Sequence, residues 1–181
     1  MKEDKKYEIL EDDFIIHKGK KLYRIKALKK FHVFGSYTVQ KGEIGGYVEG
    51  YHNLSQRGNC WICDVAKVYG NARVKDYASV GGLAEVYGNA SIENGATVGN
   101  STLVFGNARI KDSAIVRDYA RISGNAVIEF DAKIKLLTKV YDNAVVKAEI
   151  AYNNKICGNT EVCRRVSIIY DEEISGNSKL V

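Results

Sequence analysis

The sequence repeats a six-residue unit across most of its length. Aliphatic residues recur every six positions from Ile62 to Val146, and as far as Ala144 a small residue, usually Ala, lies four positions after each of them. An α-helix cannot keep a period of six on one face, because its apolar stripe recurs at 3.6 residues. Short strands joined by tight turns fit this period. The repeat therefore predicts a β-helix built from hexapeptides.

A second, longer repeat shows how the hexapeptides assemble. The stretch VYGNA begins at Val68 and returns eighteen residues later at Val86. Three strands and three turns of six residues make one coil of a triangular prism, and successive coils should stack about 4.8 Å apart. We predict about six to seven such coils over residues 56–181. One inward column should then contain Val68, Val86, Val104, Ile122 and Val140.

The six-residue register slips once, after Val146. The aliphatic series resumes at Ile150, a step of four residues instead of six. We expect a kink or an ejected loop near residues 147–150.

Residues 1–55 lack the six-residue period. KKYEIL, DFIIH and KLYRIKAL alternate apolar with polar residues, and HKGKK lies between the last two as a turn. This pattern indicates a short antiparallel hairpin or small sheet. We predict an N-terminal β cap and linker that cover the open end of the prism, whose unpaired strand edges would otherwise favour aggregation.

Composition narrows the class of protein. Charged residues make up 27%, hydrophobic residues 45%, and the net charge is +5. There is no apolar leader, and no run approaches the ~18 residues of a membrane span. Four cysteines are too few for a disulfide scaffold, so reduced thiols and a cytoplasmic location are expected. The mild positive charge permits an acidic partner without requiring nucleic acid.

The outward positions of the first face form an aromatic ladder with basic neighbours. Aromatic pairs on adjacent strands stabilise each other, which is the structural interpretation. Aromatic residues also anchor interfaces, so a docking surface is the functional one. The basic neighbours would steer an acidic partner. The aromatic residues are Tyr69, Tyr87, Phe105 and Tyr141, and the basic ones are Lys67, Arg121 and Lys139.

The other two faces differ in charge. Lys75, Glu93, Lys111, Glu129 and Lys147 alternate in sign on the second face, which predicts an ion-pair ladder of structural value. The third face is small and flat at Ser79, Gly81, Thr97 and Gly99, and becomes basic at Arg117, Lys133 and Lys135. This basic end would suit phosphates or an acidic protein surface, and the flat part would suit contact between copies.

No residues converge on a metal or cofactor site in the sequence. Cys60 and Cys63 have the CxxC spacing, but the hexad register turns Cys60 inward and Cys63 outward, which disfavours zinc and redox chemistry. The histidines are His17, His32 and His52, none within the repeats. We therefore expect no metal and no cofactor.

The hexads resemble those of the left-handed β-helix family, whose best-known members are trimeric hexapeptide acyltransferases. The stretch IGGYVEGYHNLSQRGNCWI, followed by repeats of the VYGNA type, is more closely similar to YdcK-like proteins, many of them encoded in phages and prophages. The resemblance implies an all-β, left-handed parallel β-helix. It implies no activity for particular residues.

Three functions follow as hypotheses. The first is a rigid, non-catalytic body that docks on a host protein or nucleoprotein, such as a defence nuclease complex that it would inhibit in the manner of an anti-CRISPR protein. The second is an acyltransferase with His52 as general base, although the chain lacks the inserted loop and C-terminal helix that often complete the acyl-donor site of that family. The third is a self-assembling structural module. None of them involves a membrane.

Overall fold

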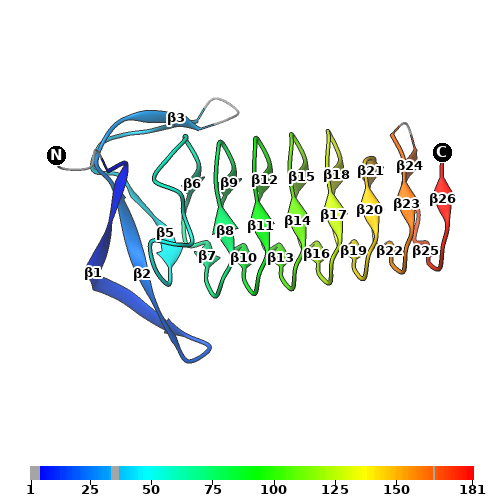
Figure 1. Ribbon diagram of the computed structural model, residues 1–181, viewed down its shortest axis with the longest axis horizontal. Helices are drawn as coiled ribbons and strands as arrows, with labels where there is room; N and C mark the ends of the chain where they lie inside the picture. The colour runs from blue at the N-terminus through cyan, green and yellow to red at the C-terminus, as the bar shows by residue number, and fades with distance from the viewer. Residues whose placement is uncertain (1–4, 34–36, 165) are drawn as a thin grey trace.

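The computed structural model describes residues 5–33, 37–164 and 166–181. These residues form strands and turns only, arranged as a stack of similar coils with a small sheet at the N-terminal end (Figure 1). The chain is a parallel β-solenoid of about seven coils, because two of its sheets contain seven strands each. Its left-handed sense stays a prediction. The described residues contain no helix that is both long and apolar enough to span a membrane.

Each coil contributes one short strand to each of three sheets. Sheet 1 runs through β7 (Lys67–Val68), β10 (Glu85–Val86), β13 (Leu103–Val104), β16 (Arg121–Ile122), β19 (Lys139–Val140), β22 (Lys155–Ile156) and β25 (Glu173–Ile174). Sheet 2 contains β8 (Arg73–Val74), β11 (Ser91–Ile92), β14 (Arg109–Ile110), β17 (Val127–Ile128), β20 (Val145–Val146), β23 (Glu161–Val162) and β26 (Lys179–Leu180). Sheet 3 contains β6 (Trp61–Ile62), β9 (Ser79–Val80), β12 (Thr97–Val98), β15 (Ile115–Val116), β18 (Lys133–Ile134), β21 (Glu149–Ile150) and β24 (Ser167–Ile168).

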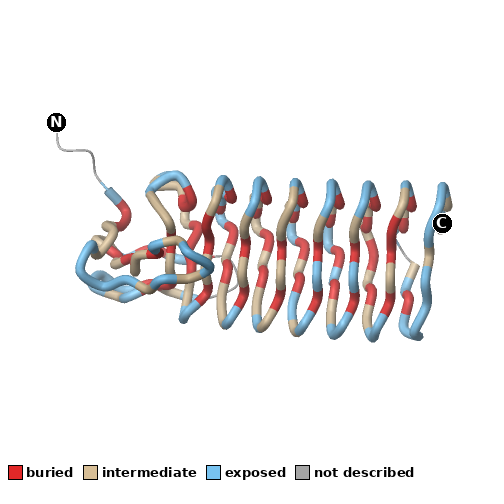
Figure 2. The backbone as a smooth tube through the Cα atoms, turned by 90° about the horizontal axis from the view of Figure 1, so that it is seen from below, coloured by how far each residue is buried: buried red, intermediate tan, exposed pale blue. Residues whose placement is uncertain are grey.

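The predicted inward column is confirmed. Val68 pairs with Val86, and the parallel register continues through Val104 and Ile122 to Val140. All five side chains have no exposed surface. The buried positions recur at the same places from coil to coil (Figure 2), except in the last coil, where Ile174 and Leu180 are only partly buried. Because each apolar side chain packs on its equivalent in the next coil, the core is one continuous column of small and β-branched residues.

The corners between strands depend on a left-handed backbone conformation. In most turns the residue two positions after the buried aliphatic has a positive φ, as at Gly70, Asp76 and Asn100. Gly, Asn and Asp accept this conformation most readily. Among the described residues of the solenoid, the only other residue types with a positive φ are Phe130 (60°), Leu136 (56°) and Tyr152 (70°).

An asparagine ladder follows the corner between sheets 1 and 2. Each side-chain amide donates a hydrogen bond from Nδ2 to Oδ1 of the equivalent residue in the next coil, at 2.8–3.0 Å. These hydrogen bonds connect equivalent turns along the whole solenoid. The members are Asn71, Asn89, Asn107, Asn125, Asn143, Asn159 and Asn177.

The N-terminal residues form the predicted antiparallel cap. Strands β1 (Tyr7–His17) and β2 (Lys20–Ala27) make a hairpin whose turn lies within HKGKK, and β3 (Phe31–Val33) pairs with β4 (Tyr37–Val39). Strand β5 (Ile44–Val48) pairs antiparallel with β2 and parallel with β7. Sheet 1 is therefore one ten-stranded sheet that continues from the cap into the solenoid.

The register step after Val146 produces a shortened corner, so the expected kink or ejected loop is wrong. Two residues, Lys147 and Ala148, connect β20 to β21. Strand β21 still pairs with β18 in regular register, and the Lys133 amide donates to the Ala148 carbonyl at 3.1 Å. The stack absorbs the missing residues because Ala148, at 5% exposure, fits against the core at the corner.

Candidate interaction surface

The aromatic ladder on sheet 1 is a tight stack at its N-terminal end. The rings of Tyr69 and Tyr87 lie 5.1 Å apart with an interplanar angle of 6°, and those of Tyr87 and Phe105 lie 5.1 Å apart at 4°. Ser123 interrupts the column before Tyr141. The stacking interpretation is confirmed for the first three rings. The three rings differ in their exposure to solvent.

The tip of the cap hairpin covers the first ring. Lys18 Nζ lies 2.8 Å from Glu85 Oε2, and His17 Nε2 lies 3.1 Å from the same oxygen. The Tyr69 hydroxyl donates to Glu85 at 3.0 Å, and Lys18 Nζ lies 5.1 Å from the centre of the Tyr87 ring. Tyr69 is 4% exposed as a result. It therefore holds the cap to the solenoid, and only Tyr87 and Phe105 remain partly exposed in the stacked part of the ladder.

Burial and charge set the protonation of this contact. Burial disfavours the charged form of Glu85, but hydrogen bonds from Lys18, His17 and Tyr69 outweigh it and lower the pKa of the carboxyl group. Burial is also the main cause that raises the pKa of Tyr69 to about 12. At neutral pH the carboxylate therefore accepts hydrogen bonds from a neutral phenol and a lysine.

The ion-pair ladder on sheet 2 forms with one difference from the prediction: the second partner of Glu93 is Arg109, at 3.4 Å. Lys75 pairs with Glu93 at 2.9 Å and Lys111 with Glu129 at 2.7 Å, while Lys147 lies 3.6 Å from Glu129. Each of these cations has a carboxylate in an adjacent coil. Exposed pairs of this kind add little stability individually, and they leave no uncompensated charge for a partner.

Sheet 1 instead carries a column of neighbouring cations in its C-terminal half. Arg121 pairs in register with Lys139, and Lys139 pairs with Lys155. Lys155 has an ion pair with Glu173 at 3.0 Å. Neither Arg121 nor Lys139 has an ion pair with any residue that the structure describes. Like charges directly opposite each other on adjacent strands are destabilising, so this cation column reduces the stability of the fold.

The basic residues of sheet 3 lie on the other side of the same corner. Arg117 and Lys133 are exposed, whereas Lys135 forms an ion pair with Glu149. That pair lowers the pKa of the Glu149 carboxyl group, chiefly through the hydrogen bond from Lys135. The structure thus places the five predicted cations, from sheets 3 and 1, around one corner of the prism. They are Arg117, Arg121, Lys133, Lys135 and Lys139.

An apolar ridge lies between these two groups of cations, and sequence reasoning missed it. It consists of Tyr119, Leu136, Leu137 and Tyr152, which are 63%, 41%, 54% and 52% exposed. With Asn153 and Asp171 they line a hollow of about 460 Å³. The signal was present in the sequence: Leu136 and Tyr152 occupy a turn position that holds Gly, Asn or Asp in the preceding coils.

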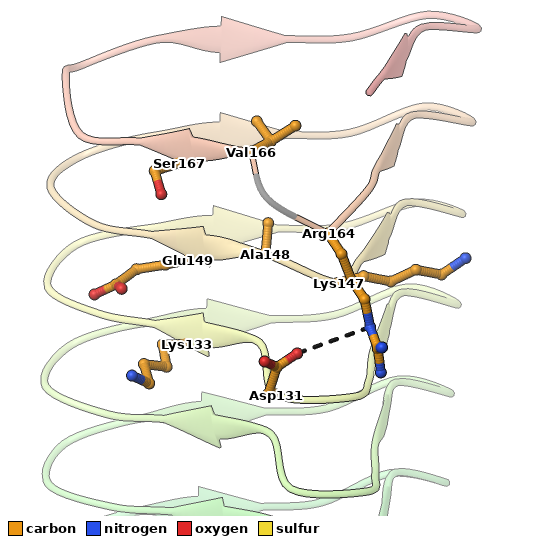
Figure 3. Close-up of a pocket in the computed structure, with 8 residues that line it drawn as sticks. All are labelled: Asp131, Lys133, Lys147, Ala148, Glu149, Arg164, Val166 and Ser167. Atoms are coloured by element: carbon orange, nitrogen blue, oxygen red, sulfur yellow. Dashed lines mark ion pairs between the residues drawn. The ribbon is translucent and has the colours of Figure 1, made fainter.

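A second hollow results from the shortened corner (Figure 3). Its volume is about 510 Å³, and Ala148 and Val166 lie at its apolar centre. Arg164 lies 3.9 Å above the centre of the Phe130 ring and 3.9 Å from Asp131. Lys147 points away from the hollow toward sheet 2, where it pairs with Glu161 at 2.6 Å. Several of the charged side chains near this hollow therefore have an oppositely charged partner within the chain.

The residues considered for catalysis or metal binding lie apart from these surfaces. Cys60 is buried beside Lys6, whose Nζ lies 3.2 Å from its sulfur, whereas Cys63 is partly exposed. No group of three or more His, Cys, Asp or Glu in the described part of the chain is placed to hold a metal ion. His52 is exposed, and its Nε2 lies 2.8 Å from the Gly70 carbonyl oxygen. That nitrogen must donate its proton, so it is not free to act as a base.

Comparison with known proteins agrees with the fold. Residues 66–82 match a family described as YdcK Beta solenoid repeat. The matched segment covers about one coil, including β7, β8 and β9. No curated protein matches the chain. The match supports the similarity of these repeats to those of YdcK-like proteins and carries no activity with it.

Proposed function

We propose that the protein is a rigid, non-catalytic binding body that docks on an acidic macromolecular surface. The observation that carries the proposal is the cation column of sheet 1, where Arg121 and Lys139 are register neighbours without a carboxylate partner among the described residues. The ladder of sheet 2 shows that this solenoid can alternate its charges. A column that does not alternate loses stability, and an acidic partner would compensate for that loss.

The scaffold suits this role. Successive coils are hydrogen-bonded to one another throughout, so the outward side chains are held in fixed positions before a partner arrives. Preorganisation of this kind reduces the entropy lost on binding. The resemblance to YdcK-like proteins extends the proposal: the partner is a macromolecule of a host cytoplasm, for example a defence nuclease complex.

The test compares two double variants of matched charge. Arg121→Ala with Lys139→Ala removes the unpaired cations, and Lys75→Ala with Lys111→Ala removes two cations from the ion-pair ladder. Tagged forms of both variants and of the wild type are used to capture proteins from a bacterial lysate at several salt concentrations. We expect the first variant to lose the captured partner and the second to retain it, with capture by the wild type falling as salt rises. Equal capture by all three proteins would refute the proposal.

A further inference from the structure

The corner between sheets 3 and 1 departs from the turn chemistry of the rest of the solenoid. Leu136 and Tyr152 have φ values of 56° and 70°, in the region that disfavours residues with a large side chain. In the three coils that precede Leu136, the equivalent turn position holds Gly82, Asn100 and Asp118. These three residue types adopt the conformation at lower cost. The two bulky residues therefore introduce backbone strain that the fold does not require.

Burial does not repay this strain. Leu136 is 41% exposed and Tyr152 is 52% exposed, so much of each apolar surface remains in water. The neighbouring Tyr119 and Leu137 are still more exposed, at 63% and 54%. Strained residues that gain little from the fold are characteristic of functional sites. Exposed apolar residues that gather in one place are characteristic of interaction sites.

We propose, on the basis of the proposed function, that the apolar ridge is the anchor of the interface and that its occupant is an acidic protein segment carrying apolar side chains. The hollow of about 460 Å³ between the ridge residues would take an apolar side chain of the partner. Cations flank the ridge on both sides, with Arg117 before Tyr119 and Arg121 after it. Lys139 follows Leu136 and Leu137, whereas Lys135 on their other side is already paired with Glu149. Acidic residues on both sides of an apolar anchor would complement this arrangement.

The chemistry of the ridge favours protein over the other two classes of partner. Tyr119 and Tyr152 could stack on nucleic acid bases, but Leu136 and Leu137 offer no π-face, so only half of the ridge would suit a base. Asp118 and Asp171 belong to the same corner and would repel any anion placed in the hollow itself, so the hollow suits an uncharged group. In a symmetric dimer with ridge against ridge, the flanking cations of the two copies would face each other. A protein segment can place apolar side chains in the hollow and its carboxylates on the flanking cations, away from Asp171, whereas a nucleic acid carries a phosphate on every nucleotide.

The experiment measures binding of two labelled peptides by fluorescence anisotropy. One contains glutamate and leucine residues, and the other has serine in place of every leucine. The variant Leu136→Asn with Tyr152→Asn removes the anchor and relieves the strain, and Leu83→Asn is the control, because Leu83 is exposed on the same corner outside the ridge. We expect the double variant to bind the leucine peptide about tenfold more weakly than the wild type does, with binding of the serine peptide unchanged. Its melting temperature should equal or exceed that of the wild type.

Each contrary result has a distinct meaning. Equal affinity of the wild type for the two peptides would overturn the ridge proposal while leaving a charge-based interface intact, and the lysate comparison judges the proposed function separately. A lower melting temperature of the double variant would show that the two side chains serve the fold. Tighter binding of a labelled oligothymidylate than of either peptide would assign the surface to nucleic acid. A dimer seen by sedimentation velocity, and lost in the double variant, would assign it to a second copy.

Discussion

Removal of one asparagine from the middle of the asparagine ladder should destabilise the protein measurably. Asn107 accepts a hydrogen bond from Asn89 and donates one to Asn125, both at 2.9 Å. A hydrogen bond contributes about 0.5–1.5 kcal/mol net, and these amides are exposed, so each bond belongs near the lower end of that range. Asn107→Ala should therefore reduce the free energy of unfolding by about 1 kcal/mol.

A double-mutant cycle separates the ladder from the individual residues. Asn89→Ala and Asn107→Ala each remove two ladder bonds, but the double variant removes three, because the two residues share one bond. The double variant should thus be less destabilised than the sum of the single variants by about 0.5–1 kcal/mol. Asn71→Ala with Asn177→Ala, at opposite ends of the ladder, should be additive.

Urea denaturation followed by circular dichroism gives the four free energies needed for each cycle. The reasoning would be refuted in either of two ways: if Asn107→Ala had the stability of the wild type, or if the adjacent pair were as additive as the distant pair. The first result would mean that water replaces the amide bonds without loss. The second would mean that the asparagines act only on their own turns.

Three further predictions concern the backbone, the pH dependence and catalysis. Gly106→Ala should lower the melting temperature, because its φ is 72° and a Cβ would lie 3.0 Å from the Gly124 amide nitrogen, whereas Gly99→Ala, where a Cβ meets no atom within 4 Å, should not. Burial raises the pKa values of Cys63 and Tyr69 to about 12 from 9.0 and 10.0. Because these groups lose their protons at lower pH in the unfolded chain than in the folded protein, the free energy of unfolding should fall between about pH 9 and 12. Urea denaturation should show this fall, and it should be less steep in Cys63→Ser. A flat profile would contradict this. His52→Ala should capture partners as the wild type does and show the same absence of acyl transfer from coenzyme A donors, and loss of activity in the folded variant would favour the enzyme hypothesis.

The regular part of the fold was predictable because the position of a residue within its hexapeptide decides whether its side chain points inward or outward. A six-residue period fixes which side chains point inward, so the column from Val68 to Val140 followed directly from spacing. The ion pairs of sheet 2 followed from the same register, since residues eighteen apart become neighbours.

The candidate site was less predictable, for two physical reasons. Tyr69 was expected to face a partner, but whether it is covered depends on where the tip of the cap hairpin lies, and no repeat encodes that contact. The apolar ridge was missed because its residues lie in the turns, whereas the six-residue period describes only the residues of the strands. A turn residue that contradicts its own conformational preference, such as Leu136, is visible in the sequence once the turn position of each coil is known.

The continuity of sheet 1 has a mechanical consequence. The hydrogen bonds between coils run along the stack, and the N-terminal cap and strand β26 lie at its opposite ends (Figure 1). A force that pulls the two ends of the solenoid apart would therefore act first on the hydrogen bonds of the last coil. The coils would unfold one at a time, because the hydrogen bonds of different coils would not break together. Each coil of eighteen residues would release about 60 Å of extended chain. Stretching a single molecule should then give a series of small, evenly spaced steps, ending where the cap hairpin holds the first coil.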